Sequence, residues 1–283
     1  MTELAREAAN TARTTLALPS PLRLGLARGG IELRQFFRDR AAVIFSFGFP
    51  ALILLLLGSI FNGSFDHPGV SASQVYSASM IAYGIVSTAF ITMGAGLAVD
   101  REDGTLKRLR GTPITASSYF IGKLILVAVA TLAEVVLLLA TGVLVFGMPL
   151  PHEAARWLTF AWLLVLSVVA CTLLGIAASR LANSARGAAV VLTVPVVALQ
   201  FLSGIFVHPI TRLPDWMLPL SSIFPVKWMG QGFRSVFLPD SMVRTEAAGS
   251  WEHGTTAVML ALWCVLGLAL CLATFRWSGR RSG

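Results

Sequence analysis

Long apolar stretches alternate with short polar connections along most of this chain. Six stretches approach the length of about 20 apolar residues that a helix needs to cross a membrane. They lie near residues 41–61, 75–99, 121–146, 157–178, 187–207 and 255–275. The pattern predicts an all-α membrane protein with six transmembrane helices. We expect one membrane domain over residues 30–276, a mobile arm at 1–29 and a polar tail at 277–283.

Composition supports a membrane protein and excludes a nucleic-acid-binding one. Only 13% of the residues are charged, whereas soluble domains have about 25%. The net charge of +8 comes from basic residues that flank the apolar stretches. Sixteen Lys and Arg residues fall on the side that holds both termini and the loop 100–120, and five on the other. By the positive-inside rule, both termini and this loop are predicted to be cytoplasmic.

Two further helical features are predicted outside the spans. Residues 30–40 place apolar and basic side chains on different sides, which indicates an amphipathic helix along the cytoplasmic membrane surface. Simple anchoring of the first span by its positive charges explains the same pattern equally well. The apolar side contains Ile31, Leu33, Phe36 and Phe37, and the basic side contains Arg34, Arg38 and Arg40.

The outer segment 208–254 is too long for a simple turn and is interrupted by prolines, so no single helix can run through it. We predict two short, partly re-entrant helices before the last span. A seventh span is the competing interpretation, and the charges of Asp215, Lys227 and Arg234 argue against it.

The loop 100–120 is the most informative segment. It begins acidic, turns at Gly104, continues as a short basic helix and stops near Pro113. Thr105 is expected to cap this helix, and Leu106 and Leu109 to form its apolar contact face. The pattern indicates a coupling helix that docks on a separate motor protein. The predicted contact residues are Asp100, Arg101, Glu102, Asp103, Gly104, Thr105, Leu106, Lys107, Arg108 and Leu109.

This loop, with its Gly-Thr-Leu, Thr-Pro and Gly-Lys pairs, resembles the permease subunits of type-2 ATP-binding-cassette (ABC) exporters. A second block over residues 202–234, beginning Leu-Ser-Gly and containing Leu-Pro and a final Arg, is similar to the same permeases. Daunorubicin-resistance-type drug or lipid export permeases are the nearest subgroup. The chain departs from the family pattern at Asp100, where glutamate is common, and in the basic residues Lys107, Arg108 and Arg110.

The resemblance implies a permease without catalytic residues, placed in a bacterial cytoplasmic membrane. It implies two partner ATPase subunits that carry ATP and Mg, a second permease copy or related chain, surrounding membrane lipids and an amphiphilic substrate moved by alternating access. The chain lacks a phosphate-binding loop of its own, since Ser117 stands where the first glycine of that motif belongs. No cofactor is therefore expected in this chain, and no metal-ligand spacing is present.

The resemblance also assigns the second and fifth spans to the substrate path. Helical spacing places two sets of side chains on one face of each span, although ordinary helix packing explains them equally well. The sets are Tyr76, Met80, Tyr83, Ser87 and Phe90, and Thr193, Gln200 and Ser203. Glu134, near the middle of the third span, is either a substrate or proton contact or a buried packing carboxyl. An ion-gradient-driven transporter that uses Glu134 is the alternative function.

Overall fold

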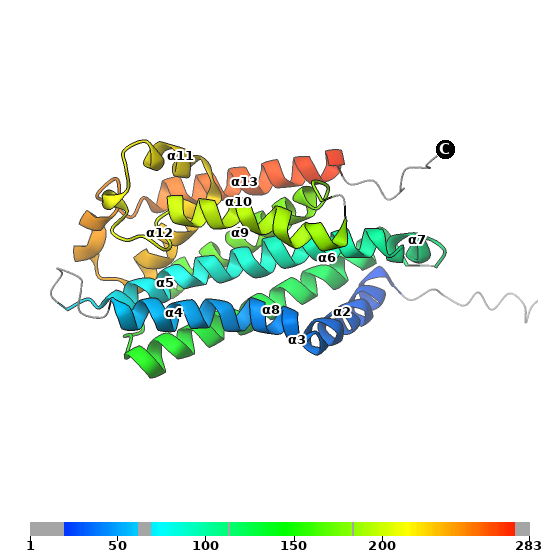
Figure 1. Cartoon of the computed structure of the whole chain (residues 1–283), viewed down its shortest axis with the longest axis horizontal. Helices are drawn as coiled ribbons and strands as arrows, with labels where there is room; N and C mark the ends of the chain where they lie inside the picture. The colour runs from blue at the N-terminus through cyan, green and yellow to red at the C-terminus, as the bar shows by residue number, and fades with distance from the viewer. Residues whose placement is uncertain (1–19, 62–68, 113, 183, 275–283) are drawn as a thin grey trace, which may run out of the picture.

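The chain is all-helical wherever its structure can be described. The computed structural model describes residues 20–61, 69–112, 114–182 and 184–274, and every regular element within these ranges is a helix. Most of the predicted mobile arm and the predicted tail at 277–283 lie outside the described residues. The helices that cross the molecule run along its long axis (Figure 1).

Five described helical segments are long and apolar enough to cross a membrane. The first is Arg40–Ile60, built from α3 (Arg40–Val43), η1 (Ile44–Gly48) and α4 (Phe49–Ile60). The second is Ala72–Glu102, built from α5 (Ala72–Ile85), the π-helical η2 (Val86–Thr92) and α6 (Met93–Glu102). The others are α8 (Ala116–Phe146), α9 (Ala154–Ala178) and α13 (His253–Thr274).

The predicted fifth span is shorter than expected. Its helix, α10, covers Ala185–Leu202 rather than 187–207. Gly204 has a φ of +71°, a left-handed conformation that suits glycine and turns the chain just after the helix. A helix therefore occupies each of the six predicted places, but the six-span count is supported by length for five of them in the described residues.

The second span extends further than predicted. It continues through Asp100 and Arg101 to Glu102, so the first three residues of the predicted loop are helical. Charged residues end an apolar span without ending a helix, because a helix that leaves the membrane keeps its backbone hydrogen bonds. All of α5 is buried, which makes it the centre of the bundle.

The N-terminal helix begins earlier than expected. α2 covers Pro21–Arg38, whereas the sequence pattern placed its start at Gly30. The Ser20 hydroxyl accepts a hydrogen bond from the Arg23 backbone N–H, and Pro21 is well suited to the first helical turn. Residues 21–29 of the predicted mobile arm are thus an ordered part of the fold.

α2 packs closely along α8. A Cβ built on Gly25 would lie 2.6 Å from Ile121, and one on Gly29 would lie 2.8 Å from Ile125. Only glycine allows the two helices to approach this closely. Elsewhere on α2, large apolar side chains stay exposed, namely Leu22, Leu26, Ile31 and Phe37. Of the predicted apolar side, Ile31 and Phe37 are exposed whereas Phe36 is buried, and the position of this helix on the membrane surface stays a prediction.

The two ends of the molecule differ in construction. One end holds α2 and the short helix α7 (Thr105–Arg110) (Figure 1). The other holds η3 (Ile210–Arg212), α11 (Met217–Ile223), α12 (Pro225–Phe237) and η4 (Asp240–Thr245). α11 and α12 are two short helices in the segment where two were predicted, and their partly re-entrant position in the membrane stays a prediction. Every residue of α12 is buried, and α12 packs on α5, α9 and α13.

Candidate coupling site and transport path

The short helix α7 is connected to the end of the second span by a turn at a glycine. Gly104 separates α6 from α7 and has a φ of +76°. The Asp103 carboxylate accepts a hydrogen bond of 2.9 Å from the Thr105 backbone N–H, and this bond lowers the pKa of Asp103. The prediction that Thr105 caps α7 is wrong, because Gly104 takes the capping position and the Thr105 hydroxyl accepts from Arg108 instead.

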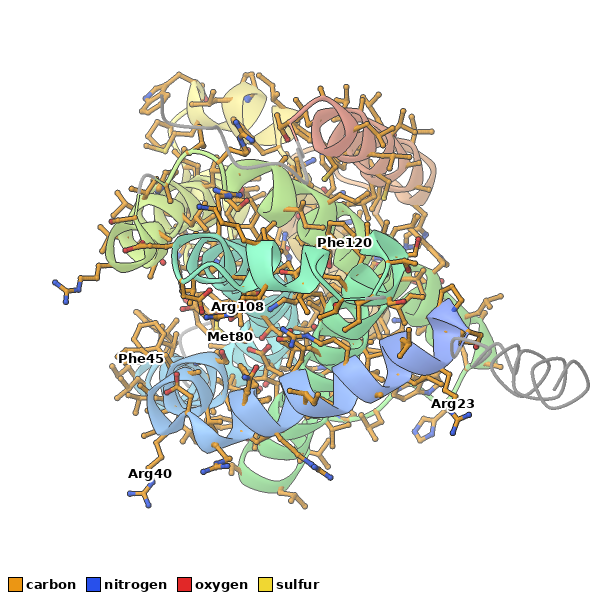
Figure 2. All side chains as sticks on the ribbon, turned by 90° about the vertical axis from the view of Figure 1, so that its right-hand side faces the viewer. Arg23, Arg40, Phe45, Met80, Arg108 and Phe120 are labelled. Atoms are coloured by element: carbon orange, nitrogen blue, oxygen red, sulfur yellow. The ribbon has the colours of Figure 1, made fainter. Side chains whose placement is uncertain are left out.

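α7 presents charge outward and apolar side chains inward. Leu106 and Leu109 are buried and belong to the main hydrophobic core. They anchor α7 to its own chain, so the prediction that they face a motor protein is wrong. Lys107 and Arg108 are exposed, as are Glu102 and Asp103 just before the turn. Figure 2 looks onto this end of the molecule and labels Arg108.

Arg101 does not belong to the exposed charged surface. Its guanidinium donates hydrogen bonds of 3.1 and 2.9 Å to the carbonyl and hydroxyl oxygens of Ser179, at the end of α9. The predicted outward contact of Arg101 is therefore replaced by an internal one. This bond fixes the end of α6 to the end of α9.

Asp100 is likewise turned inward, into a chain of buried charges. The Lys123 ammonium lies 2.7 Å from Asp100 Oδ2 and 2.8 Å from Glu32 Oε2. The Tyr119 hydroxyl donates a 2.7 Å hydrogen bond to Asp100, and Arg28 pairs with Glu32 at 2.6 Å. We call these five residues the Lys123 cluster.

The Lys123 cluster joins three helices. Arg28 and Glu32 come from α2, Asp100 from α6, and Tyr119 and Lys123 from α8. Lys123 is only 4% exposed, and a buried charge is tolerated only when it is paired and hydrogen-bonded. Sequence reasoning missed this cluster. The only signal was a lysine directly inside an apolar span, with an acidic residue in a flanking amphipathic helix.

Most predicted path residues lie inside the packed bundle. Tyr76, Met80 and Tyr83 are buried in α5, and Gln200 and Ser203 are buried at the end of α10. Ser87, Phe90 and Thr193 are partly buried. The structure brings the two spans together through Phe206, whose ring lies 5.6 Å from that of Tyr83 and 4.8 Å from that of Phe201. Of the predicted set, Phe90 also lines an apolar cavity of about 410 Å³.

Comparison with known proteins decides the family. The model of the ABC-2 type transporter family matches residues 30–238, from within α2 to the end of α12. The chain belongs to the ABC-2 type transporter family. It is thus a permease of the type-2 ABC class, as the two sequence blocks indicated.

This ABC-2 permease also resembles individual curated proteins. It is 25% identical over 163 residues to the probable multidrug ABC transporter permease YbhR of Escherichia coli strain K12, which is 58% of this chain and 43% of YbhR. It is 27% identical over 210 residues to the putative transport permease ycf38 of Porphyra purpurea, which is 72% of this chain and 70% of the relative. The chain therefore matches less than half the length of YbhR.

Glu134 of the ABC-2 permease is completely buried at the α5–α8 contact. Thr88 donates a 2.6 Å hydrogen bond to Glu134 Oε2. A Cβ built on Gly84 would lie 2.5 Å from Glu134 Oε1, so a glycine is required for this approach. Among the described protein atoms, Oε1 has no hydrogen-bond partner. The carboxyl is held by packing against α5 and by one hydroxyl.

The end of the ABC-2 permease opposite α7 holds a second buried ion pair. Arg234 of α12 and Glu246 are both 0% exposed, and Arg234 Nη2 lies 2.9 Å from Glu246 Oε2. Arg234 Nη1 also donates to the Ser79 hydroxyl and to the Gly204 carbonyl. Arg234 therefore connects α12 with α5 and with the turn after α10. The sequence indicated Arg234 only as a charge that argues against a seventh span and as the final residue of the second family block.

Proposed function

We propose that this ABC-2 permease is the transmembrane subunit of an ATP-driven exporter. It moves an amphiphilic substrate, such as a drug, lipid or glycolipid, out across the cytoplasmic membrane by alternating access. The observation that carries the proposal is the short helix α7. Its charged side is exposed, and its apolar side packs into the hydrophobic core. Such a helix can contact another protein and transmit that protein's movement to the helix bundle.

The contacts between α7, the end of α6 and the bundle suggest how a movement of α7 is transmitted. Leu106 and Leu109 pack into the main core, so α7 does not move independently of the helices beneath it. Arg101 holds α9, and Asp100 holds α8 through Lys123. Force on α7 therefore reaches three spanning segments and, through Glu32, the N-terminal helix α2.

The partner proposed for the exposed side of α7 is an ABC ATPase that carries ATP and Mg. Two such subunits and a second permease copy, or a related permease chain, complete the exporter. Family membership and the similarity to YbhR, a probable multidrug ABC transporter permease, support this assembly. The excess of basic residues on the α7 side supports a cytoplasmic position for both termini.

The substrate path is proposed along the second span and α10. Tyr76, Met80 and Tyr83 provide aromatic and thioether surface, and Gln200 and Ser203 provide buried polar atoms without hydrogen-bond partners among the described residues. An apolar wall with a few convergent polar groups suits an amphiphile. The described structure packs these residues closely, so transport requires the second span and α10 to separate.

The experiment is co-purification of the tagged permease with its cognate ATPase, followed by assay in proteoliposomes. We expect a stable complex whose ATP hydrolysis is coupled to movement of a fluorescent amphiphile such as daunorubicin. The permease alone should hydrolyse no ATP. Transport by the permease alone, driven by a proton gradient without ATP, would instead support the ion-driven alternative.

A further inference from the structure

An apolar groove lies beside the proposed path, between α10 and α13. Its floor is α9, with Cys171 and Leu174, and its sides carry Leu199 of α10 and Trp263 of α13. The cavity within it measures about 410 Å³, inside the range of roughly 300–1,000 Å³ typical of ligand pockets. Both flanking helices run along the long axis of the molecule (Figure 1). We call it the α10–α13 groove.

The groove is bordered by α12 at one end and by an exposed arginine at the other. Phe224 and Pro225, at the start of α12, line the first end, where the Trp263 indole is fixed by a 2.9 Å hydrogen bond to the Ile223 carbonyl. The opposite end reaches Arg180, in the turn that follows α9. That end carries α7, because the preceding residue, Ser179, binds Arg101. The groove thus runs from within the bundle toward one membrane surface.

Arg180 lacks a counter-ion in the described structure. Its side chain is exposed, and none of the ion pairs among the described residues includes it. The segment from Ser179 to Arg186, which joins α9 to the first turn of α10, contains no acidic residue. An apolar slot with a cation at its membrane-surface end is complementary to one molecule available at that place, a phospholipid with an anionic headgroup.

We propose that the α10–α13 groove binds one acyl chain of an anionic phospholipid from the leaflet at the α7 end, with the lipid phosphate on Arg180. The acyl chain covers the apolar walls of the groove, and the Arg180 guanidinium donates charge-assisted hydrogen bonds to the phosphate oxygens. Because the groove separates α10 from α13, a bound chain fills the space beside the helix that must move in transport. The site concerns the permease itself and needs no ATPase.

The test is lipid binding by the purified full-length permease, measured by native mass spectrometry. Phosphatidylglycerol and phosphatidylcholine with identical acyl chains are added in detergent. We expect a preference for phosphatidylglycerol that falls about fivefold in Arg180→Gln, the contribution of one arginine near a membrane surface. Arg186→Gln, in the first turn of α10 but outside the groove lining, is the control and should keep the preference.

A second pair of variants tests the groove itself. Ala177→Trp fills it and should abolish the retained lipid, whereas Val165→Trp, on an exposed part of the same helix α9, should not. Phosphatidylglycerol with brominated chains should quench Trp263 emission, measured as the difference from Trp263→Phe, in the parent but not in Ala177→Trp. Equal lipid retention by Ala177→Trp and the parent would overturn the proposal. Loss of the lipid only on dissociation of a dimer would also overturn the proposal, because a second copy of the permease would then cover the groove.

Discussion

The Lys123 ammonium lies 2.7 Å from the Asp100 carboxylate, inside the membrane domain rather than on its surface. Asp100 begins the segment that the sequence assigned to the ATPase contact. Because Asp100 pairs with Lys123, it helps to fix that segment to the bundle from inside, together with Glu32 from the N-terminal helix. In the family pattern an acidic residue precedes α7 and a Gly-Lys pair follows it. In this chain the acidic residue is Asp100 and the lysine is Lys123, and the two form an ion pair.

Removing Lys123 should destabilise the permease strongly. Lys123→Met would leave two carboxylates, Asp100 and Glu32, close together without their shared cation. Breaking a buried ion pair by removing one partner costs about 3–5 kcal/mol. We expect a lower thermal unfolding temperature of the detergent-solubilised protein, followed by intrinsic fluorescence.

The control for this prediction is Lys107→Met, which removes an exposed lysine on α7 and should leave the unfolding temperature unchanged. Adding Asp100→Asn to Lys123→Met should restore part of the lost stability, because the carboxylate left without a cation is then gone, whereas Glu32 keeps its ion pair with Arg28. If Lys123→Met melts with the parent, the cluster contributes no stability.

Arg234 should be equally sensitive at the other end. In Arg234→Met, Glu246 loses its ion-pair partner Arg234 while remaining buried. The expected loss is again about 3–5 kcal/mol. Arg244→Met, in the exposed part of η4, serves as the matched control. Cross-linking or proteolysis of the segment 238–252 should become faster in Arg234→Met alone, and equal rates in both variants would contradict this role.

Much of this fold could be predicted from hydropathy, because membrane helices are selected by apolar length. The ends were harder to predict. α2 begins at Pro21 because of a local serine cap and two glycines that fit against α8, and neither changes hydropathy. α10 ends early at a left-handed glycine that the pattern did not distinguish from other glycines.

The site was predictable as a segment but not in its contacts. Charge and glycine placed the turn and the short helix α7 correctly. Which side of α7 faces the bundle depends on tertiary packing, so Leu106 and Leu109 were assigned to the wrong surface. The pairing of Lys123 with Glu32 joins residues 91 positions apart, a distance that no local pattern reports.

Glu134 should be a packing residue rather than a proton carrier. Glu134→Gln keeps the size of the side chain and an oxygen that can accept from Thr88, so ATP-driven daunorubicin transport should stay near the parental rate. Gly84→Ala should be harmful instead, because its Cβ would meet the carboxyl. Transport rates measured from pH 6 to 8 are the readout. A large loss in Glu134→Gln with normal assembly would restore the charge-dependent role.

Glu102→Lys should weaken the coupling without disturbing the membrane domain. Glu102 is exposed at the last turn of α6, next to the proposed ATPase contact. Reversing its charge adds a cation to a surface that already contains Lys107 and Arg108. We expect parental expression and melting, but less ATPase retained on the affinity column. Glu153→Lys, exposed at the opposite end, should retain the ATPase fully.

Gly104 provides the sharpest test of α7, because its effect can be separated from packing. A Cβ at position 104 would meet no atom within 4 Å, so a substitution acts only through the backbone conformation at φ +76°. Asparagine tolerates this left-handed region, whereas a β-branched residue is strained there by about 1–3 kcal/mol. Gly104→Val should therefore displace α7 and reduce ATPase binding and coupled transport at least severalfold. Gly104→Asn should fall between it and the parent.

The control is Gly111→Ala at the other end of α7, where φ is −81° and an alanine fits without strain. Binding of the ATPase, its hydrolysis rate and daunorubicin movement are measured for all three variants in the same liposomes. Membrane insertion should be equal throughout, because position 104 follows the apolar part of the span. If Gly104→Val matches Gly111→Ala in all three measurements, the geometry of α7 does not matter to coupling, and the proposed route of force from the ATPase into the bundle is wrong.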